Sequence, residues 1–143
     1  MDKLDTYRIV DTLSKSQLDL ILQVYDGAIA AFRAAIKAYQ ANDYNAGYNQ
    51  LERAKRFVTH LYTTLDVEAG GEIAEKLAML YAYIIDHVNL AEATKDLAII
   101  DDNITRLDNI RQGWLALKQQ NTKARATGQV NPCGDKVGFL TSV

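Results

Sequence analysis

The chain of 143 residues has 16 basic and 18 acidic residues, a formal net charge of −2, and a hydrophobic content of 48%. A chain of this length removes roughly 68–70% of its unfolded surface from water, so one domain can build a core without a metal or disulfide staple. Basic and acidic residues are intermixed, which excludes the basic stripe of a nucleic-acid-binding protein, and the single cysteine, Cys133, excludes an intramolecular disulfide.

Residues 1–13 are weakly patterned, but Tyr7, Ile9 and Leu13 give them apolar content. We expect an N-terminal arm that docks on another surface. The chain does not start with the apolar run of a signal peptide. Its longest apolar run, residues 77–85, is far short of the roughly 20 residues that span a bilayer. We therefore expect a soluble cytoplasmic protein with no membrane insertion.

The first long helix is predicted over residues 17–39, with Ser14 or Ser16 as its cap. It has a bulky apolar side and a small apolar side, which predicts two different neighbours. Gly27 lies on the small side. Because glycine inside a helix costs about 1 kcal/mol relative to alanine, we expect close approach of another helix to compensate. The bulky side carries Leu18, Ile21, Leu22, Tyr25, Ile29, Phe32 and Ile36, and the small side carries Val24, Gly27, Ala28, Ala31, Ala34, Ala35 and Ala38.

A short turn at residues 41–43, with Asp43 as the expected N-cap, leads into a second helix over residues 44–65. A turn this short makes the second helix antiparallel to the first. Residues 66–71 are predicted to form the next turn, because Gly70 and Gly71 can adopt positive φ without a Cβ penalty.

The third helix is predicted over residues 72–94, where apolar residues recur three, four and seven positions apart. We expect Ile73, Leu77 and Val88 in the core, and an exposed ion pair between Glu72 and Lys76. The residues that follow this period are Ile73, Leu77, Leu80, Tyr81, Ile84, Val88 and Ala91.

A fourth helix follows Asp96, its expected cap, and its apolar residues alternate three and four positions apart as in the seam of a left-handed bundle. Its periodicity stops near Asn121. The sequence thus predicts an all-α fold, an antiparallel up-down-up-down four-helix bundle over residues 1–120 that includes the arm. Residues 121–143 are predicted to be a largely irregular, flexible tail. The apolar residues of the fourth helix are Leu97, Ile100, Ile104, Leu107, Ile110, Trp114 and Leu117.

Helical bundles often hold metal, and a di-iron bundle requires Glu-x-x-His on two helices. Phe57 lies three residues before His60. Ile84 has the same position before His87, so the di-iron pattern fails at both histidines. The chain also contains no haem-attachment motif, phosphate-binding loop or serine nucleophile elbow. We expect no enzymatic activity and no cofactor or metal.

Two longer motifs remain. Residues 24–28 read Val-Tyr-Asp-Gly-Ala, and residues 70–83 contain Gly-Gly-x-Ile-Ala-x-x-Leu-x-x-Leu-Tyr-x-Tyr. Arg111 and Trp114 form Arg-x-x-Trp, and Tyr7 precedes them all. In order and spacing these residues resemble the flagellar secretion chaperone family of the FliS type, in which Leu usually stands at the first position of the first motif.

The chain departs from the usual pattern of that family at three positions. Lys15 stands where a proline usually opens the first helix, and Lys76 where an asparagine is usual. Glu92 stands where Ala-Asn is usual. These departures leave the expected fold unchanged.

The resemblance implies binding without turnover. Members of the family hold the disordered C-terminal segment of flagellin in the cytoplasm and prevent its polymerisation before secretion. The resemblance therefore implies a flagellin client and flagellar export components as further partners, and the arm is expected to cover the binding surface when no client is bound. The expected contact residues are Tyr7, Leu18, Leu22, Tyr25, Leu80, Tyr81, Tyr83 and Ile84.

Two other functions stay open at this point. The first is a self-associating structural or adaptor bundle, a homodimer whose surplus apolar face is the interface. The second is a sensor bundle that binds a cofactor or metal, for which the sequence offers no ligand set. The eight tyrosines fit an interface, because each combines a rigid apolar ring with a hydroxyl that can hydrogen bond.

Overall fold

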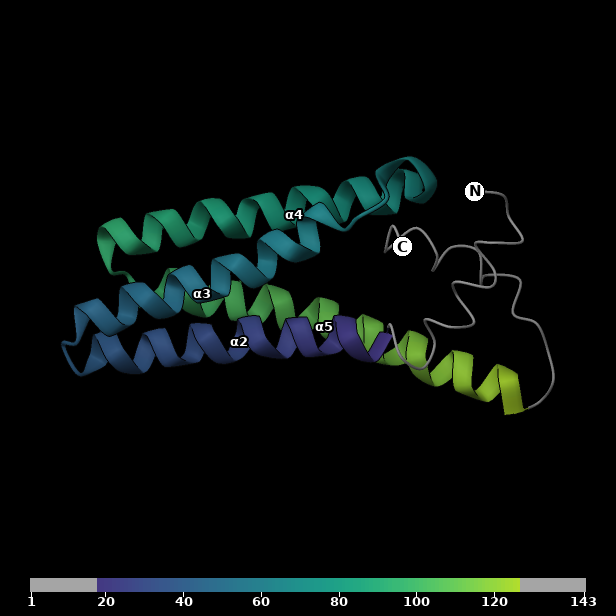
Figure 1. Cartoon of the computed structure of the whole chain (residues 1–143), viewed down its shortest axis with the longest axis horizontal. Coiled ribbons are helices and arrows are strands. Elements are labelled where there is room, and N and C mark those ends of the chain that lie inside the picture. Colours follow the sequence, from purple (N-terminus) through teal and green to yellow (C-terminus); the bar gives the residue numbers. More distant parts are fainter. Residues whose placement is uncertain (1–17, 127–143) are drawn as a thin grey trace.

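The computed structural model describes residues 18–126, which form four α-helices: α2 (Leu18–Gln40), α3 (Tyr44–Thr63), α4 (Val67–Thr94) and α5 (Leu97–Ala126). Consecutive helices run antiparallel, as Figure 1 shows. Helix α2 packs against α3 and α5, and α4 packs against the same two helices, so α2 and α4 lie diagonally opposite each other. The predicted up-down-up-down four-helix bundle is confirmed. The arm with Tyr7, both candidate caps at Ser14 and Ser16, and residues 127–143 of the predicted tail lie outside the described residues.

The turns follow the predicted capping residues. The Ala46 N–H donates a hydrogen bond of 3.1 Å to the Asp43 carboxylate, which caps α3. The Ala98 N–H donates one of 3.0 Å to the Asp96 carboxylate at the start of α5. Each bond satisfies one of the free N–H groups that a helix start leaves. Both predicted caps are confirmed.

The third helix begins earlier than predicted, at Val67 instead of Glu72. The Gly70 N–H donates to the Asp66 carbonyl at 2.9 Å and so closes a first helical turn. Gly71 then interrupts the helix with φ 56° and ψ −134°. Only glycine takes up such a backbone conformation without a Cβ clash. The glycines therefore mark the break as expected, but the residues before it form a helical turn.

The fourth helix is longer than predicted and continues to Ala126 instead of ending near Asn121. The predicted boundary was wrong for residues 121–126. These residues lack bulky apolar side chains, so the periodic signal disappears there. They do contain lysine, arginine and two alanines, which are good helix formers, and the next glycine after Gly113 is at position 128.

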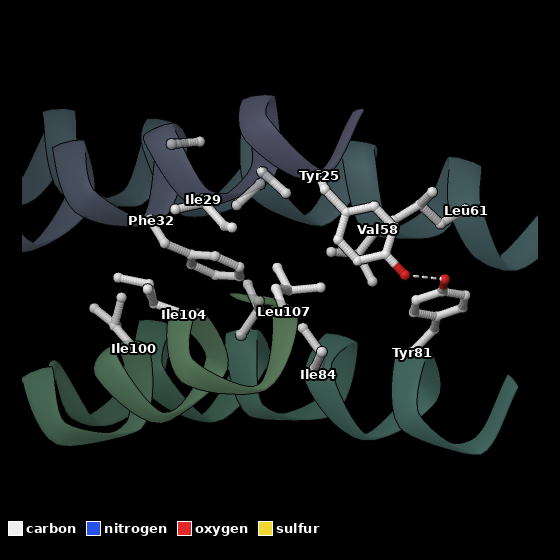
Figure 2. Packing of buried hydrophobic residues seen from close by; sticks show 14 of the residues in the cluster. Tyr25, Ile29, Phe32, Val58, Leu61, Tyr81, Ile84, Ile100, Ile104 and Leu107 are labelled. Carbon is white, nitrogen blue, oxygen red and sulfur yellow. Dashed lines mark hydrogen bonds between the residues drawn. The ribbon is translucent and has the colours of Figure 1, made fainter. Parts of the chain in front are cut away.

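The core contains the bulky side of α2 and inward-facing residues of the other three helices (Figure 2). Val88 is fully buried, as predicted, and Leu77 is half-buried. Ile73 is 48% exposed, so its assignment to the core was wrong. The fully buried large side chains include Tyr25, Tyr81, Phe32, Leu18, Leu51, Ile84, Ile100, Leu107, Val58 and Val88.

Gly27 allows the close approach that was expected of it. A Cβ atom at this position would lie only 2.7 Å from Cζ of Phe57. The ring of Phe57, from α3, therefore occupies the space that a larger side chain on α2 would need. This contact explains a glycine in the middle of a 23-residue helix, where it is otherwise unfavourable.

Candidate functional site

The centre of the candidate site is a pair of tyrosines from the two diagonal helices. Tyr25 of α2 and Tyr81 of α4 point toward each other, and their hydroxyl groups form a hydrogen bond (Figure 2). Their rings meet edge to face, with centroids 6.4 Å apart and planes at 60°. Tyr25 is 0% exposed and Tyr81 is 1% exposed. The pair therefore joins α2 to α4 through the interior of the bundle.

Burial keeps both phenols protonated. It raises the pKa of Tyr25 to about 12, although the hydrogen bonds with Tyr81 and Trp114 oppose the shift. Burial raises the pKa of Tyr81 further, and the neighbouring Tyr25 adds to the shift. A phenol whose pKa lies far above 7 stays protonated at neutral pH and gives up its proton poorly, so the pair is suited to structure and binding more than to proton transfer.

Trp114 of α5 lies beside this pair. It is 4% exposed, and its side chain opposes a small part of the rise in the pKa of Tyr25. Within the described part of the chain, its indole nitrogen has no acceptor in good hydrogen-bond geometry. Tyr25, Tyr81 and Trp114 thus bring polar atoms from three helices into the apolar core.

Two ion pairs join α2 to α5 near the tyrosine pair. The Arg111 Nε atom lies 2.6 Å from the Asp26 carboxylate, and these side chains are 26% and 55% exposed. Lys118 pairs with Asp19. Exposed ion pairs contribute little stability, typically about 0.2–1 kcal/mol each. These two ion pairs therefore matter mainly for the position of the helices, because they hold the second half of α5 against the start of α2.

Apolar side chains are exposed along the first half of α4, after the Gly71 break. Ile73 is 48% exposed and Met79 is 72% exposed. Leu77 and Leu80 are half-buried and pack on the core. Because Ile73, Leu77 and Leu80 are spaced by four and three residues, they share one helix face. We call these three residues the α4 stripe.

The second half of α4 is held more closely by polar contacts. The Asn103 side chain donates a hydrogen bond of 3.3 Å to the Ile84 carbonyl, and Lys55 donates one of 2.9 Å to Asn89. The α4 stripe lies before this region, on the part of α4 that diverges from α5 in Figure 1. An exposed apolar helix face next to a well-packed core can bind another helix.

Tyr83 is held within the chain. Its ring stacks on His87, with centroids 3.8 Å apart, and the Arg106 guanidinium lies 4.4 Å from the ring centroid. Arg106 also pairs with Asp102 at 2.9 Å, and the Tyr83 hydroxyl donates to the same carboxylate at 3.4 Å. This half-buried stack connects α4 to α5.

The structure divides the residues predicted to contact a partner into three groups. Leu80 and Tyr83 are half-buried and reach the surface. Tyr7 lies outside the described residues. The residues that lie in the core are Leu18, Leu22, Tyr25, Tyr81 and Ile84.

Sequence reasoning missed four residues of this region as site candidates. Arg111 and Trp114 were visible as a motif, but spacing alone gave no reason to place them beside Tyr25. Ile73 was assigned to the core because it follows the helical period of its neighbours. Met79 does not follow that period. A residue that lies off the apolar face of its helix is expected to be exposed, and this was the signal that could have identified Met79.

Residues 18–126 offer no group of three or more His, Cys, Asp or Glu side chains that could hold a metal ion. Over the same residues, no helix has both the length and the hydropathy needed to cross a bilayer. The chemistry of this region is therefore that of an apolar surface over a neutral, hydrogen-bonded interior.

Comparison with known proteins gives consistent matches. Residues 1–121 match the family model of flagellar protein FliS. The chain is 34% identical over 113 residues to the flagellar secretion chaperone FliS of Salmonella typhimurium, covering 78% of this chain and 82% of that protein. It is 25% identical over 95 residues to the protein of the same name from Vibrio cholerae, covering 66% of this chain and 70% of that protein. It is 26% identical over 111 residues to the one from Campylobacter jejuni, covering 78% and 87%.

Proposed function

Because the chain belongs to the FliS family of flagellar proteins, we propose that it is a flagellar secretion chaperone whose client is the C-terminal segment of flagellin. FliS proteins are chaperones and not enzymes. By binding that segment in the cytoplasm, the protein would prevent flagellin from polymerising before secretion. Components of the export machinery are the second class of partner.

The observation that supports this proposal best is the α4 stripe with Met79 beside it. A client segment that folds into an amphipathic helix would place residues at i, i+3, i+4 and i+7 against such a surface. Folding a disordered segment on binding costs about 2–5 kcal/mol, so several apolar contacts are needed. Ile73 and Met79 are already exposed, and Leu80 and Tyr83 extend the same region.

The buried members of the predicted contact set have a different proposed role. Tyr25 and Tyr81 would support the surface from below by fixing α4 relative to α2. Leu18, Leu22 and Ile84 would fill the core beneath it. A client would then touch Ile73, Met79, Leu80 and Tyr83 directly, and it would depend on the tyrosine pair only through the position of α4. The five supporting residues are thus Leu18, Leu22, Tyr25, Tyr81 and Ile84.

The test is binding of a peptide from the C-terminus of flagellin, measured by calorimetry and by circular dichroism of the mixture against the sum of its parts. We expect binding with a gain of helix. Ile73→Ser should weaken binding about 5- to 30-fold, the equivalent of about 1–2 kcal/mol of lost apolar burial. Leu90→Ser is the matched control, because Leu90 is 46% exposed and lies in the second half of the same helix.

Two results would contradict the proposal. If the peptide neither binds nor gains helix, this client is wrong. If Ile73→Ser and Leu90→Ser weaken binding equally, the α4 stripe is not the contact surface. Light scattering distinguishes the remaining alternative, because a dimer of constant mass that the peptide leaves unchanged would favour a self-associating bundle.

A further inference from the structure

Helices α4 and α5 are joined by polar contacts near the middle of α4. The Asn103 side chain of α5 donates a hydrogen bond of 3.3 Å to the Ile84 carbonyl of α4. About one turn further along α5, the Arg106 guanidinium lies 4.4 Å from the centroid of the Tyr83 ring. These contacts identify the facing sides of the two helices, which carry Tyr83 and Ile84 on α4 and Asn103 and Arg106 on α5.

The α4 stripe lies on the side of α4 that faces α5. Its three residues precede Ile84 by four, seven and eleven positions, and these spacings return to nearly the same face of a helix. Ile84 is fully buried, Leu80 and Leu77 are half-buried, and Ile73 is 48% exposed. The cover over this side of α4 is therefore lost gradually from Ile84 toward Ile73.

The facing side of α5 is also apolar beyond the polar contacts. Ile110 follows Asn103 by seven residues, Gly113 follows Arg106 by seven, and Leu117 follows Gly113 by four. Ile110 and Leu117 are half-buried and pack on the core. Gly113 is exposed, and a Cβ atom there would meet no atom of another described helix within 4 Å. We call Ile110, Gly113 and Leu117 the α5 stripe.

Ile73 and Gly113 lie at the same level of the bundle. Because the two helices are antiparallel and rise about 1.5 Å per residue, Ile73 lies about 16 Å from Ile84. Gly113 lies about 15 Å from Asn103 in the same direction. Packed helices have axes about 8–10 Å apart, a distance at which a Cβ atom on the facing side touches the neighbouring helix. The open space at Gly113 and the exposure of Ile73 therefore show that α4 and α5 have separated at this level, in agreement with their divergence in Figure 1.

We propose that the α4 stripe and the α5 stripe are the two walls of one binding site, which takes a single amphipathic helix of the client between α4 and α5. This inference rests on the proposed function. It adds that α5 supplies half of the contact surface, and that Gly113 leaves room for a large apolar side chain of the client.

The spacing and the charges of the site favour a single helix as the occupant. Both walls repeat every three to four residues, which matches the apolar face of an amphipathic helix. The nearby charged groups form ion pairs, Glu72 with Lys76 on α4 and Asp102 with Arg106 on α5. Neither wall therefore presents an excess of one charge, and recognition depends on apolar burial.

The test fills the site without disturbing the fold. Gly113→Leu places a side chain in the open space, and because leucine favours a helix more than glycine does, the urea midpoint of unfolding should not fall. The Kd of the peptide from the C-terminus of flagellin should rise at least about tenfold, because the added side chain occupies the space of the bound helix. Gln112→Leu is the matched control, since Gln112 is exposed and lies about 100° around the helix from Gly113, away from the facing side.

Three results would overturn the site. If the peptide binds wild type, Gly113→Leu and Gln112→Leu equally well, α5 is not a wall of the site, although the proposed function would stand as long as Ile73→Ser weakens binding. A lower urea midpoint for Gly113→Leu than for wild type would show that the space is already filled. A mass by light scattering that falls to half in Gly113→Leu would show that a second copy of the chain occupies the site.

A measurement without the peptide separates the site from its proposed client. The dye ANS (1-anilinonaphthalene-8-sulfonate) fluoresces when it binds exposed apolar surface. Gly113→Leu should lose part of the dye emission seen with wild type, whereas Gln112→Leu should retain it. If this loss occurs but the peptide does not bind, the client is wrong and the site stands. Equal emission from all three proteins would overturn the site.

Discussion

The hydroxyl groups of Tyr25 and Tyr81 hydrogen bond across the diagonal of the bundle, between two helices that otherwise pack mainly against α3 and α5. Both side chains are almost completely buried. Tyr25 belongs to the motif at residues 24–28 and Tyr81 to the motif at residues 70–83. Two motifs that are far apart in the sequence therefore meet in one contact.

Removing one hydroxyl of this pair should leave the other buried without a partner. We expect Tyr25→Phe and Tyr81→Phe each to lower the free energy of unfolding by about 1–2 kcal/mol. The double variant should lose less than the sum of the two, because it leaves no orphaned hydroxyl. Urea unfolding of the three variants gives this cycle, and Tyr62→Phe, at a position that is 44% exposed, is the control. Additive losses would show that the two hydroxyls do not interact.

Two glycines inside helices should respond oppositely to alanine. A Cβ atom at Gly113 meets nothing within 4 Å, so Gly113→Ala should stabilise the protein by up to about 1 kcal/mol through helix propensity. Gly27→Ala should destabilise it by about 1 kcal/mol or more, because the new methyl group overlaps the Phe57 ring. Thermal and urea unfolding would measure both changes. In a Phe57→Ala background the loss from Gly27→Ala should disappear, and its persistence there would contradict the contact.

Alkaline pH should destabilise the protein through the tyrosine pair. The unfolded chain releases the Tyr25 proton near pH 10, whereas the folded protein holds it to about pH 12. The corresponding stability is complete below about pH 10 and is lost as the pH rises toward 12. Phenolate absorbance and circular dichroism, followed together, should show the last tyrosines ionising only as the helices unfold. If all eight tyrosines ionise while the fold is intact, the pair is not buried as described.

The Asp43 cap should be worth about 1 kcal/mol. Asp43→Ala removes the acceptor for the Ala46 N–H at the start of α3, and the free energy of unfolding should fall by this amount. Asp43→Ser should restore most of the loss, because serine also caps helices well. Equal losses in the two variants would indicate that the carboxylate acts through its charge and not as a cap.

Most of the helical framework could be predicted because it depends on local signals. The 3.6-residue period of the apolar residues predicted four helices. The capping residues Asp43 and Asp96 predicted where the second and the fourth of them begin. The close approach of another helix at Gly27 could be predicted, because glycine is otherwise unfavourable inside a helix. The late end of α5 was missed because residues 121–126 carry helix propensity without apolar periodicity.

The candidate site was harder to predict, because exposure depends on which helices lie nearby. Tyr25 and Ile73 illustrate this. Both follow the apolar period of their helices, yet Tyr25 is 0% exposed and Ile73 is 48% exposed. The helical period of the apolar residues shows which residues lie on the apolar face of a helix. It does not show whether a neighbouring helix covers that face at a given residue. That information comes from helix lengths and crossing angles, which are set by the whole bundle.

The uneven attachment of α4 has a consequence for local unfolding. Its second half is hydrogen bonded to α5 at Ile84 and to α3 at Asn89, whereas its first half is interrupted at Gly71 and exposes Ile73 and Met79. Segments with few buried contacts open more often than the whole protein unfolds. The amides of residues 72–80 should therefore exchange with deuterium faster than those of residues 84–92. The helix would then have a fixed end and an end that opens on its own, and the apolar surface lies on the end that opens.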